Sequence, residues 1–239
     1  MPIRGILFDL DFTLVDNDVG WRDLWPPVAK RFAERYPGFD PDEFSSRSYE
    51  FADGHYQLLL RGEIDFDTYR RDYVRHGVAP WGELDEDLFQ AYTEARTRSV
   101  DLIELFEDAV ETVRALRARG LKIGILTNGP SELQRRKLRR IGIESEVDAV
   151  AISEEIGASK PDPQAYARAV ALLGLEPGEV AMVGDHVVND VAGALAAGLA
   201  AAVWVERRPG ELPEGAHLAR ELAEVPALLG LNGADMFDG

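Results

Sequence analysis

The stretch that decides the fold is IRGILFDLDFT, residues 3–13. It begins with an apolar run and ends in two aspartates one residue apart, Asp9 and Asp11, followed by Thr13. A short apolar run without alternation is typical of a strand buried on both faces of a parallel sheet. Aspartate and threonine also form turns, because their short side chains hydrogen-bond to nearby backbone. The stretch alone therefore leaves two interpretations open: a simple turn, or a strand that carries two carboxylates into a site.

Four further apolar runs have the same character, short and rich in Val, Ile or Ala: residues 121–128, 147–153, 179–185 and 199–206. Helical patterns lie between them, and several end at a glycine, the residue that most readily closes a helix: Gly120, Gly142, Gly174 and Gly198. Helices that alternate with buried strands predict an α/β fold with a doubly wound, Rossmann-like parallel sheet.

One of the expected helices, PSELQRRKLRRIG at residues 130–142, carries a basic run. Ser131 lies three residues before Gln134, a spacing that predicts a capping box at the helix start. We interpret the arginines and lysine of residues 135–140 as a solvated helix face, because the run lacks interleaved aromatics. The apolar members of the helix, which we expect to be buried, are Leu133, Leu138 and Ile141.

Residues 17–99 interrupt the alternation of strands and helices. We find no convincing buried strand there, only helical stretches rich in aromatic residues. A segment of this length is far longer than the usual connection after a strand. We therefore expect two domains, an α/β core of residues 1–16 and 100–239, and a small helical domain of residues 17–99 inserted after the first strand.

Composition limits the partners. The chain has 239 residues, no cysteine and a net charge of −17, which excludes disulfides and disfavours nucleic acid and anionic membranes as partners. No apolar run is long enough to cross a bilayer, and the start lacks the features of a signal peptide, so we expect a cytoplasmic protein, monomeric or a weak homodimer. High acidity with few lysines is consistent with a high-salt cytoplasm, although high-GC coding also replaces lysine with arginine.

Polar residues follow the expected strands at their carboxyl ends, where ligands bind in an open parallel sheet. They are Asp9, Asp11, Thr127, Asn128, Lys160, Asp185 and Asp190. Each alone has an ordinary explanation as a turn, cap or surface residue. Together the carboxylates would repel one another unless a cation lay among them. Oxygen ligands without His or Cys favour a hard ion, and Mg²⁺ is the natural candidate.

Four sequence motifs resemble, in order, those of the haloacid dehalogenase-like (HAD) hydrolases: DLDFT, LTN, the lysine of SKPDP, and GDHVVND. The helical insertion between the first two is similar to the C1 cap of that superfamily. Within it, the chain most resembles phosphatases of the sialic acid 9-phosphate and nucleotide type. The resemblance covers the strand ends and the position of the insertion, so it supports the same fold and the same candidate residues.

The resemblance implies a role for each candidate in hydrolysis of a small-molecule phosphate ester. Asp9 would be the nucleophile, forming an aspartyl-phosphate, and Asp11 the general acid and base. Thr127 and Asn128 would hold the phosphate, and Lys160 would stabilise its charge together with that of Asp9.

Mg²⁺ would be held by Asp9, by the backbone carbonyl of Asp11 and by Asp185, with Asp190 nearby as an outer ligand that also orients Lys160. The acid at position 11 favours phosphoryl transfer over dehalogenation. Two alternatives stay open: a phosphomutase on the same scaffold, and a catalytically idle relative that serves as a binding module. The insertion carries no motif that specifies the substrate.

Overall fold

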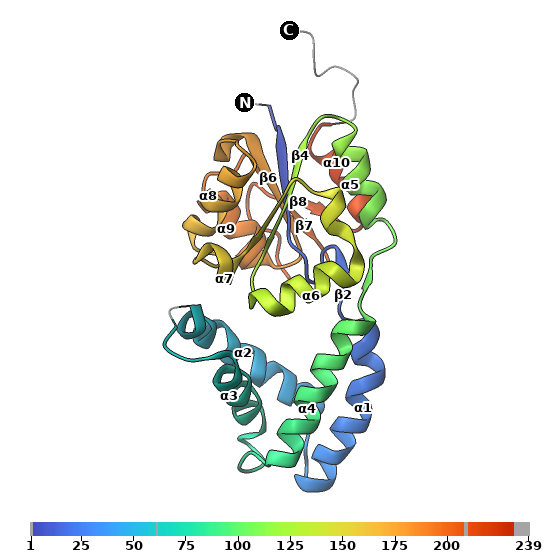
Figure 1. The fold of residues 1–239 in the computed structure, drawn as a ribbon, viewed down its shortest axis with the longest axis vertical. Helices are drawn as coiled ribbons and strands as arrows, with labels where there is room; N and C mark the ends of the chain where they lie inside the picture. The colour runs from blue at the N-terminus through green and yellow to red at the C-terminus, as the bar shows by residue number, and fades with distance from the viewer. Residues whose placement is uncertain (1, 61, 208–209, 232–239) are drawn as a thin grey trace. The chain divides into compact units, whose positions relative to one another are not determined.

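The computed structural model describes residues 2–60, 62–207 and 210–231, and the chain divides into two compact units. The α/β unit comprises Met1–Asp16 and Glu104–Gly239, and the helical unit comprises Asn17–Ile103. The chain passes from one unit to the other at Asp16–Asn17 and returns at Ile103–Glu104. Figure 1 shows both units.

The α/β unit is built on a six-stranded sheet in the order β5-β4-β1-β6-β7-β8. Its strands are β1 (Gly5–Phe8), β4 (Lys122–Thr127), β5 (Ala149–Ile152), β6 (Val180–Gly184), β7 (Ala201–Val205) and β8 (His217–Ala219). Every neighbouring pair is parallel, which confirms the expected doubly wound α/β architecture. The sequence did not predict β8, because its three residues form no apolar run. It also did not predict the small antiparallel pair of β2 (Val15–Asp16) and β3 (Glu104–Leu105).

Helices cover both faces of this sheet, with α7, α8 and α9 on one face and α5, α6 and α10 on the other (Figure 1). Their bounds are α5 (Ala109–Arg117), α6 (Ser131–Ile141), α7 (Ser153–Ile156), α8 (Pro163–Leu172), α9 (Gly193–Ala196) and α10 (Val225–Leu228). Shorter turns are η2 (Ile143–Glu146), η3 (Pro177–Glu179), η4 (Val187–Ala192, a π-helix) and η5 (Leu222–Glu224). The glycines expected to close helices have left-handed backbones, which Gly adopts without a Cβ clash.

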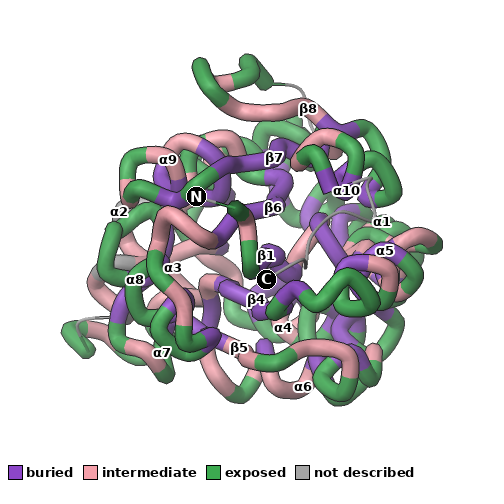
Figure 2. Tube along the Cα trace, turned by 90° about the horizontal axis from the view of Figure 1, so that it is seen from above, coloured by how far each residue is buried: buried purple, intermediate pink, exposed green. Residues whose placement is uncertain are grey.

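The centre of the sheet positions the functional residues. Ile6, Leu7 and Phe8 of β1 are fully buried, each contributing about 1.5–3 kcal/mol through removal of apolar surface from water. Figure 2 shows β1, β6 and β7 buried, and β4 is buried apart from its exposed first residue, Lys122. Phe8 pairs with Ile125 of β4 on one side and Val183 of β6 on the other. The residue after β1 therefore emerges between the ends of two buried strands.

The helical unit consists of four main helices: α1 (Asp18–Arg35), α2 (Pro41–Leu60), α3 (Phe66–Val78) and α4 (Glu86–Ser99), followed by the turn η1 (Val100–Leu102). Helix α1 packs on α4, and α2 packs on α3. Its core is aromatic: Trp25 stacks on Phe44 at 5.5 Å between ring centroids and meets Tyr92 edge-on at 5.9 Å. Many aromatic residues of the segment therefore form the interior of this unit, although Tyr49 is exposed. Ring pairs there add to the stability given by area burial.

Within residues 2–60, 62–207 and 210–231, no helix combines the length and the apolar character that crossing a bilayer requires.

Candidate active site

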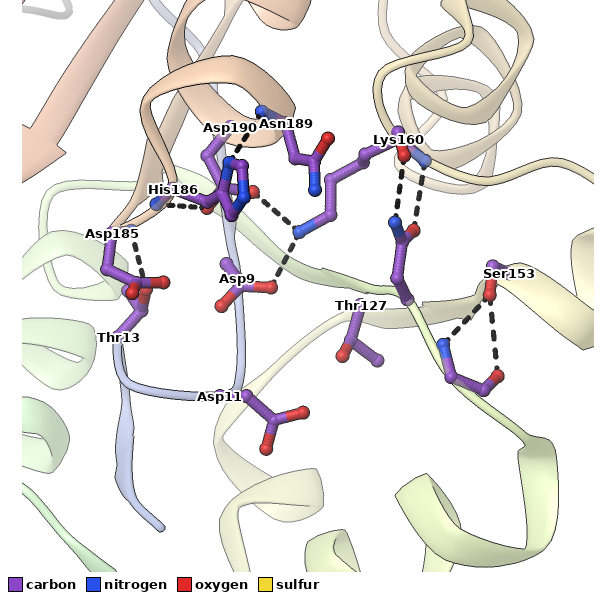
Figure 3. Close-up of polar contacts among 12 residues, drawn as sticks. Asp9, Asp11, Thr13, Thr127, Ser153, Lys160, Asp185, His186, Asn189 and Asp190 are labelled. Atoms are coloured by element: carbon purple, nitrogen blue, oxygen red, sulfur yellow. Dashed lines mark hydrogen bonds and ion pairs between the residues drawn. The ribbon is translucent and has the colours of Figure 1, made fainter. Parts of the chain in front are cut away.

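Asp9, at the end of β1, is paired with a buried lysine. The Lys160 ammonium lies 2.6 Å from Asp9 Oδ1 and 2.6 Å from Asp190 Oδ1 (Figure 3). Lys160 is 3% exposed and Asp9 6% exposed. A buried charge is tolerated only when it is paired and hydrogen-bonded, and this lysine has two such partners.

Both carboxylate oxygens of Asp190 are occupied. Oδ1 accepts a hydrogen bond from Lys160, and Oδ2 accepts one from the backbone N–H of His186 at 2.9 Å. Gly184 leaves room for this carboxylate, since a Cβ at position 184 would clash with it. Asp190 therefore fixes Lys160 and the loop after β6. His186 is exposed and caps η4, because its Nδ1 accepts a hydrogen bond from the backbone N–H of Asn189.

Asp185, the first residue after β6, is held by its backbone. Its N–H donates to the hydroxyl of Thr13 at 3.0 Å, and its carbonyl accepts from the indole Nε1 of Trp204 at 2.9 Å. Thr13 is fully buried and Trp204 nearly so, and Trp204 lies on the neighbouring strand β7. These two hydrogen bonds connect the loop after β1 and strand β7 to the loop after β6. They fix the backbone of Asp185 and so restrict where its carboxylate can lie.

The carboxylates of Asp9, Asp185 and Asp190 form a buried group whose oxygens lie within 4.8 Å of one another. Burial raises the pKa of the Asp9 carboxyl well above its ordinary value; Lys160 opposes this, and the neighbouring aspartates add to it. Burial alone lowers the pKa of the Lys160 ammonium, but Asp190 and Asp9 outweigh it and raise that pKa. The group holds three carboxylates, and the Lys160 ammonium contacts two of them, those of Asp9 and Asp190. Carboxylate oxygens, without His or Cys, are the ligands that a hard divalent cation such as Mg²⁺ prefers.

Asp11 lies apart from this cluster and contacts helix α6 instead. Lys137 Nζ is 2.6 Å from Asp11 Oδ1, and Gln134 Nε2 is 2.8 Å from Asp11 Oδ2. Gln134 Nε2 also lies 2.5 Å from the hydroxyl of Thr127, at the end of β4. Through Gln134, two of the predicted site residues are therefore linked.

Two expectations about α6 are wrong. Ser131 and Gln134 form no capping box: Pro130 precedes the helix without a side-chain cap, and the Ser131 hydroxyl donates to Glu155 at 2.5 Å. Lys137 does not belong to a solvated face, since it is buried with 8% of its surface exposed. The helix is rotated so that its inner face presents a glutamine and a lysine to the site.

One signal in the sequence pointed to this rotation. Gln134, Leu138 and Ile141 follow the i, i+4, i+7 spacing of one helix face, so Gln134 lies on the stripe that was expected to be buried. Of the expected apolar members, Leu138 is fully buried, whereas Leu133 and Ile141 are only half-buried.

Asn128 holds the backbone of Lys160 by a pair of hydrogen bonds. Its Nδ2 donates to the Lys160 carbonyl at 2.8 Å, and its Oδ1 accepts from the Lys160 N–H at 2.9 Å. The next N–H, of Gly129, donates to the hydroxyl of Ser153 at 2.9 Å, a contact that the sequence did not predict. The side chain of Asn128 thus places the lysine; a direct part of Asn128 in phosphate binding stays a prediction.

All the predicted site residues lie in the α/β unit. The structure gathers Asp9, Lys160, Asp185 and Asp190 into one buried cluster. Asn128 joins it through the backbone of Lys160, whereas Asp11 and Thr127 meet at Gln134. The site therefore places the buried Asp9 carboxylate beside the Lys160 ammonium. The Asp11 carboxylate, two residues along the chain, is held separately by helix α6.

Comparisons with known proteins show which proteins this chain is similar to. The sequence model of the family described as haloacid dehalogenase-like hydrolase matches residues 3–198. Phosphoserine phosphatase of Thermus thermophilus is 38% identical over 155 residues, which cover 65% of this chain and 59% of that protein. N-acylneuraminate-9-phosphatase of Rattus norvegicus is 27% identical, covering 95% of this chain and 94% of that protein. The crystal structure of a HAD phosphatase from Thermococcus onnurineus matches with a TM-score of 0.68 and 28% identity, covering 95% of this chain and 98% of that one.

Proposed function

Because the chain belongs to the haloacid dehalogenase-like hydrolases and is a phosphatase, we propose that it hydrolyses small-molecule phosphate monoesters through an aspartyl-phosphate on Asp9. The observation that carries the proposal is the buried pairing of Asp9 with Lys160 at 2.6 Å, at the end of the central strand. A carboxylate nucleophile divides a difficult displacement into two easier steps. The lysine lowers the repulsion between that carboxylate and an anionic phosphate.

In the first step, an oxygen of Asp9 attacks phosphorus, and the bond between phosphorus and the ester oxygen breaks. Asp11 gives a proton to the departing alcohol. In the second step, Asp11 takes a proton from water, the water oxygen attacks phosphorus, and the Asp9–phosphate bond breaks to release inorganic phosphate. One residue serves both steps because each step returns Asp11 to the protonation state that the other requires. The hydroxyl of Thr127 is assigned to a phosphoryl oxygen.

The family generally uses Mg²⁺, and the residues present fit it. The carboxylates of Asp9 and Asp185 and the backbone carbonyl of Asp11 would hold the ion, with Asp190 behind Lys160. Bound there, the ion would neutralise charge on the phosphate and help to orient it. Asp185 is held in place by neighbouring hydrogen bonds, as metal ligands commonly are. Its N–H donates to Thr13, and its carbonyl accepts from Trp204.

We assign the choice of substrate to the helical unit, residues 17–103, acting as a C1-type cap. The relatives carry names that specify different phosphate esters, phosphoserine and an N-acylneuraminate 9-phosphate. The shared chemistry is a phosphate monoester of a small polar molecule, and this is the substrate class proposed for the chain.

The test is release of inorganic phosphate from 4-nitrophenyl phosphate, measured with Mg²⁺ and with a chelator, for the wild type and for Asp9→Asn. We expect Mg²⁺-dependent turnover that falls by about 10⁴-fold or more in the variant, since the nucleophile is removed. Repeating the assay in molar KCl tests whether the acidic composition reflects a high-salt cytoplasm. Turnover that survives in Asp9→Asn would contradict the aspartyl-phosphate. A need for a bisphosphate activator, with little free phosphate released, would show a mutase instead.

A further inference from the structure

We propose that Lys137 and Gln134 of helix α6 are positioning residues for Asp11, holding its carboxylate in the orientation from which it exchanges a proton with the leaving oxygen. The inference rests on the proposed function, in which Asp11 is the general acid and base. It assigns a role to Lys137, which belongs to the basic run that the sequence indicated to be solvated, and to Gln134 on the same helix.

Both carboxylate oxygens of Asp11 accept hydrogen bonds from helix α6. Lys137 Nζ lies 2.6 Å from Oδ1, and Gln134 Nε2 lies 2.8 Å from Oδ2. A short carboxylate side chain bound at one oxygen can still swing about its χ angles, but bound at both it keeps one orientation. Lys137 and Gln134 are spaced i, i+3 on α6, so one rigid helix carries both donors toward the same carboxylate.

The orientation of the Gln134 amide follows from its neighbours. Its Nε2 faces three acceptors: Asp11 Oδ2, the hydroxyl of Thr127 and, at 3.2 Å, the carbonyl of Asn128. The opposite assignment would turn the amide oxygen against a carboxylate and a carbonyl. Gln134 is 1% exposed, and its Oε1 has no hydrogen-bond partner among the described residues. Burying this unpaired acceptor lowers the stability of the folded protein. The contact also couples Asp11 to Thr127, the residue assigned to the phosphate.

Structural stability alone gives little reason for this arrangement. Burying an ion pair removes two charges from water, and its net contribution to stability is often near zero. Other basic residues of the same helix, such as Arg139 and Arg140, are exposed. Lys137 instead turns inward to a carboxylate whose side chain is itself only 25% exposed. Lys137 is thus buried on a helix whose other face is exposed to solvent. We explain its inward position by its contact with the Asp11 carboxylate.

The test exploits the fact that proton donation matters more for a poor leaving group than for a good one. 4-Nitrophenyl phosphate releases a stable phenolate and needs little help from an acid, whereas phenyl phosphate, nearly the same in shape, needs more. The readout is kcat/KM, which covers only the steps up to phosphoryl transfer to Asp9, where the alcohol departs; hydrolysis of the aspartyl-phosphate is common to both substrates. For Lys137→Met we expect kcat/KM on phenyl phosphate to fall about 10-fold or more, and kcat/KM on 4-nitrophenyl phosphate by no more than about 2-fold. Lys137→Arg, which keeps the charge and the donors, is expected to restore part of the loss. Arg139→Met, on the exposed face of α6, is the matched control and is expected to leave both rates unchanged.

A double-mutant cycle shows whether Lys137 acts through Asp11. Asp11→Asn should show the same selective loss on phenyl phosphate, and Lys137→Met should add no further selective loss in that background. Equal losses of kcat/KM on both substrates, or losses of kcat/KM that add in the double variant, would overturn the inference. Gln134→Leu, read out in the same way, keeps the inference falsifiable if Lys137→Met does not fold by circular dichroism.

The outcomes separate this inference from the proposed function. Lys137→Met with wild-type rates on both substrates would overturn the inference and leave the proposed function intact. Turnover that survives Asp9→Asn, or a wild type that turns over neither substrate, would contradict the proposed function and the inference with it.

Discussion

The two units of the chain bury different kinds of side chain. Within the described residues, every buried charged side chain lies in the α/β unit: Asp9, Lys137, Lys160, Asp185 and Asp190. Among the side chains of the helical unit that the structure describes, the buried polar ones are two serines, Ser48 and Ser99, and the interior is otherwise apolar and aromatic.

This difference indicates what each unit is built for. Buried charges contribute little to stability, and neighbouring buried carboxylates repel one another, so we interpret the buried charges of the α/β unit as groups kept for chemistry. In the helical unit, the charged side chains lie on the surface. There Arg71 pairs with Glu86 at 2.5 Å and lowers the pKa of that glutamate to about 2. The aromatic side chains of the interior contribute to the stability of this unit. The predictions below test this division, from the largest expected effect to the smallest.

Lys160→Met should affect activity and stability together, because Lys160 separates two buried carboxylates. Removing one partner of a buried charged group costs about 3–5 kcal/mol, and Asp9 and Asp190 would then face each other without the ammonium. We also expect phosphatase activity to fall by about 10³-fold. Thermal melting and steady-state kinetics measure the two effects. A fully stable variant would show that the cluster does not depend on its lysine.

Phe32→Ala should destabilise the helical unit by about 3–5 kcal/mol, because the ring is fully buried among other rings. If the units melt independently, circular dichroism should then resolve two transitions, with only the lower one shifted. Ile125→Ala in β4, also fully buried, is the matched substitution in the α/β unit. A single shifted transition for both variants would show that the two units unfold as one.

Asp185→Asn should remove the stabilisation by Mg²⁺ without harming the metal-free protein. In the wild type, Mg²⁺ at 100 times its dissociation constant adds about 2.7 kcal/mol to the free energy of unfolding. The amide takes away one of the crowded carboxylates, so melting with a chelator should occur at an equal or higher temperature than in the wild type. The contrary result, an undiminished Mg²⁺ shift, would place the ion elsewhere.

Asp148→Asn should have the smallest effect, about 1 kcal/mol, and it should depend on pH. Burial raises the pKa of Asp148, but the N–H of Ile123 at 2.9 Å and the ammonium of Lys122 outweigh burial and lower it. The folded-state pKa is thus below the unfolded value of about 3.9, so the contribution is present above pH 4 and is lost as the pH falls through the folded-state pKa. Urea unfolding at pH 7 and at pH 3 measures it. A difference between the two proteins that grows toward acid would contradict the assignment.

The sequence by itself determined the sheet and the cluster at its edge. Five of the strands lie inside the predicted apolar runs, because a strand buried on both faces leaves a local compositional signal. Asp9, Lys160, Asp185 and Asp190 could be placed together because the carboxyl ends of parallel strands share one edge, whatever the detailed packing. Strand β8 leaves no such signal. It has three residues and lies at the edge of the sheet, paired only with β7, so its sequence is not a run of apolar residues.

Only the tertiary structure decided how the second carboxylate is held. The letters QRRKLRR specify an amphipathic basic helix, but not which of its basic side chains turns inward, because that depends on the rotation of α6 against the ends of β1 and β4. Likewise, Asn128 reads locally as a turn residue, and its pairing with the backbone of Lys160 joins positions 32 residues apart. Periodicity and composition are local properties of the chain, whereas the partners of Asp11 and Lys160 come from distant segments that meet only when the sheet and its helices pack.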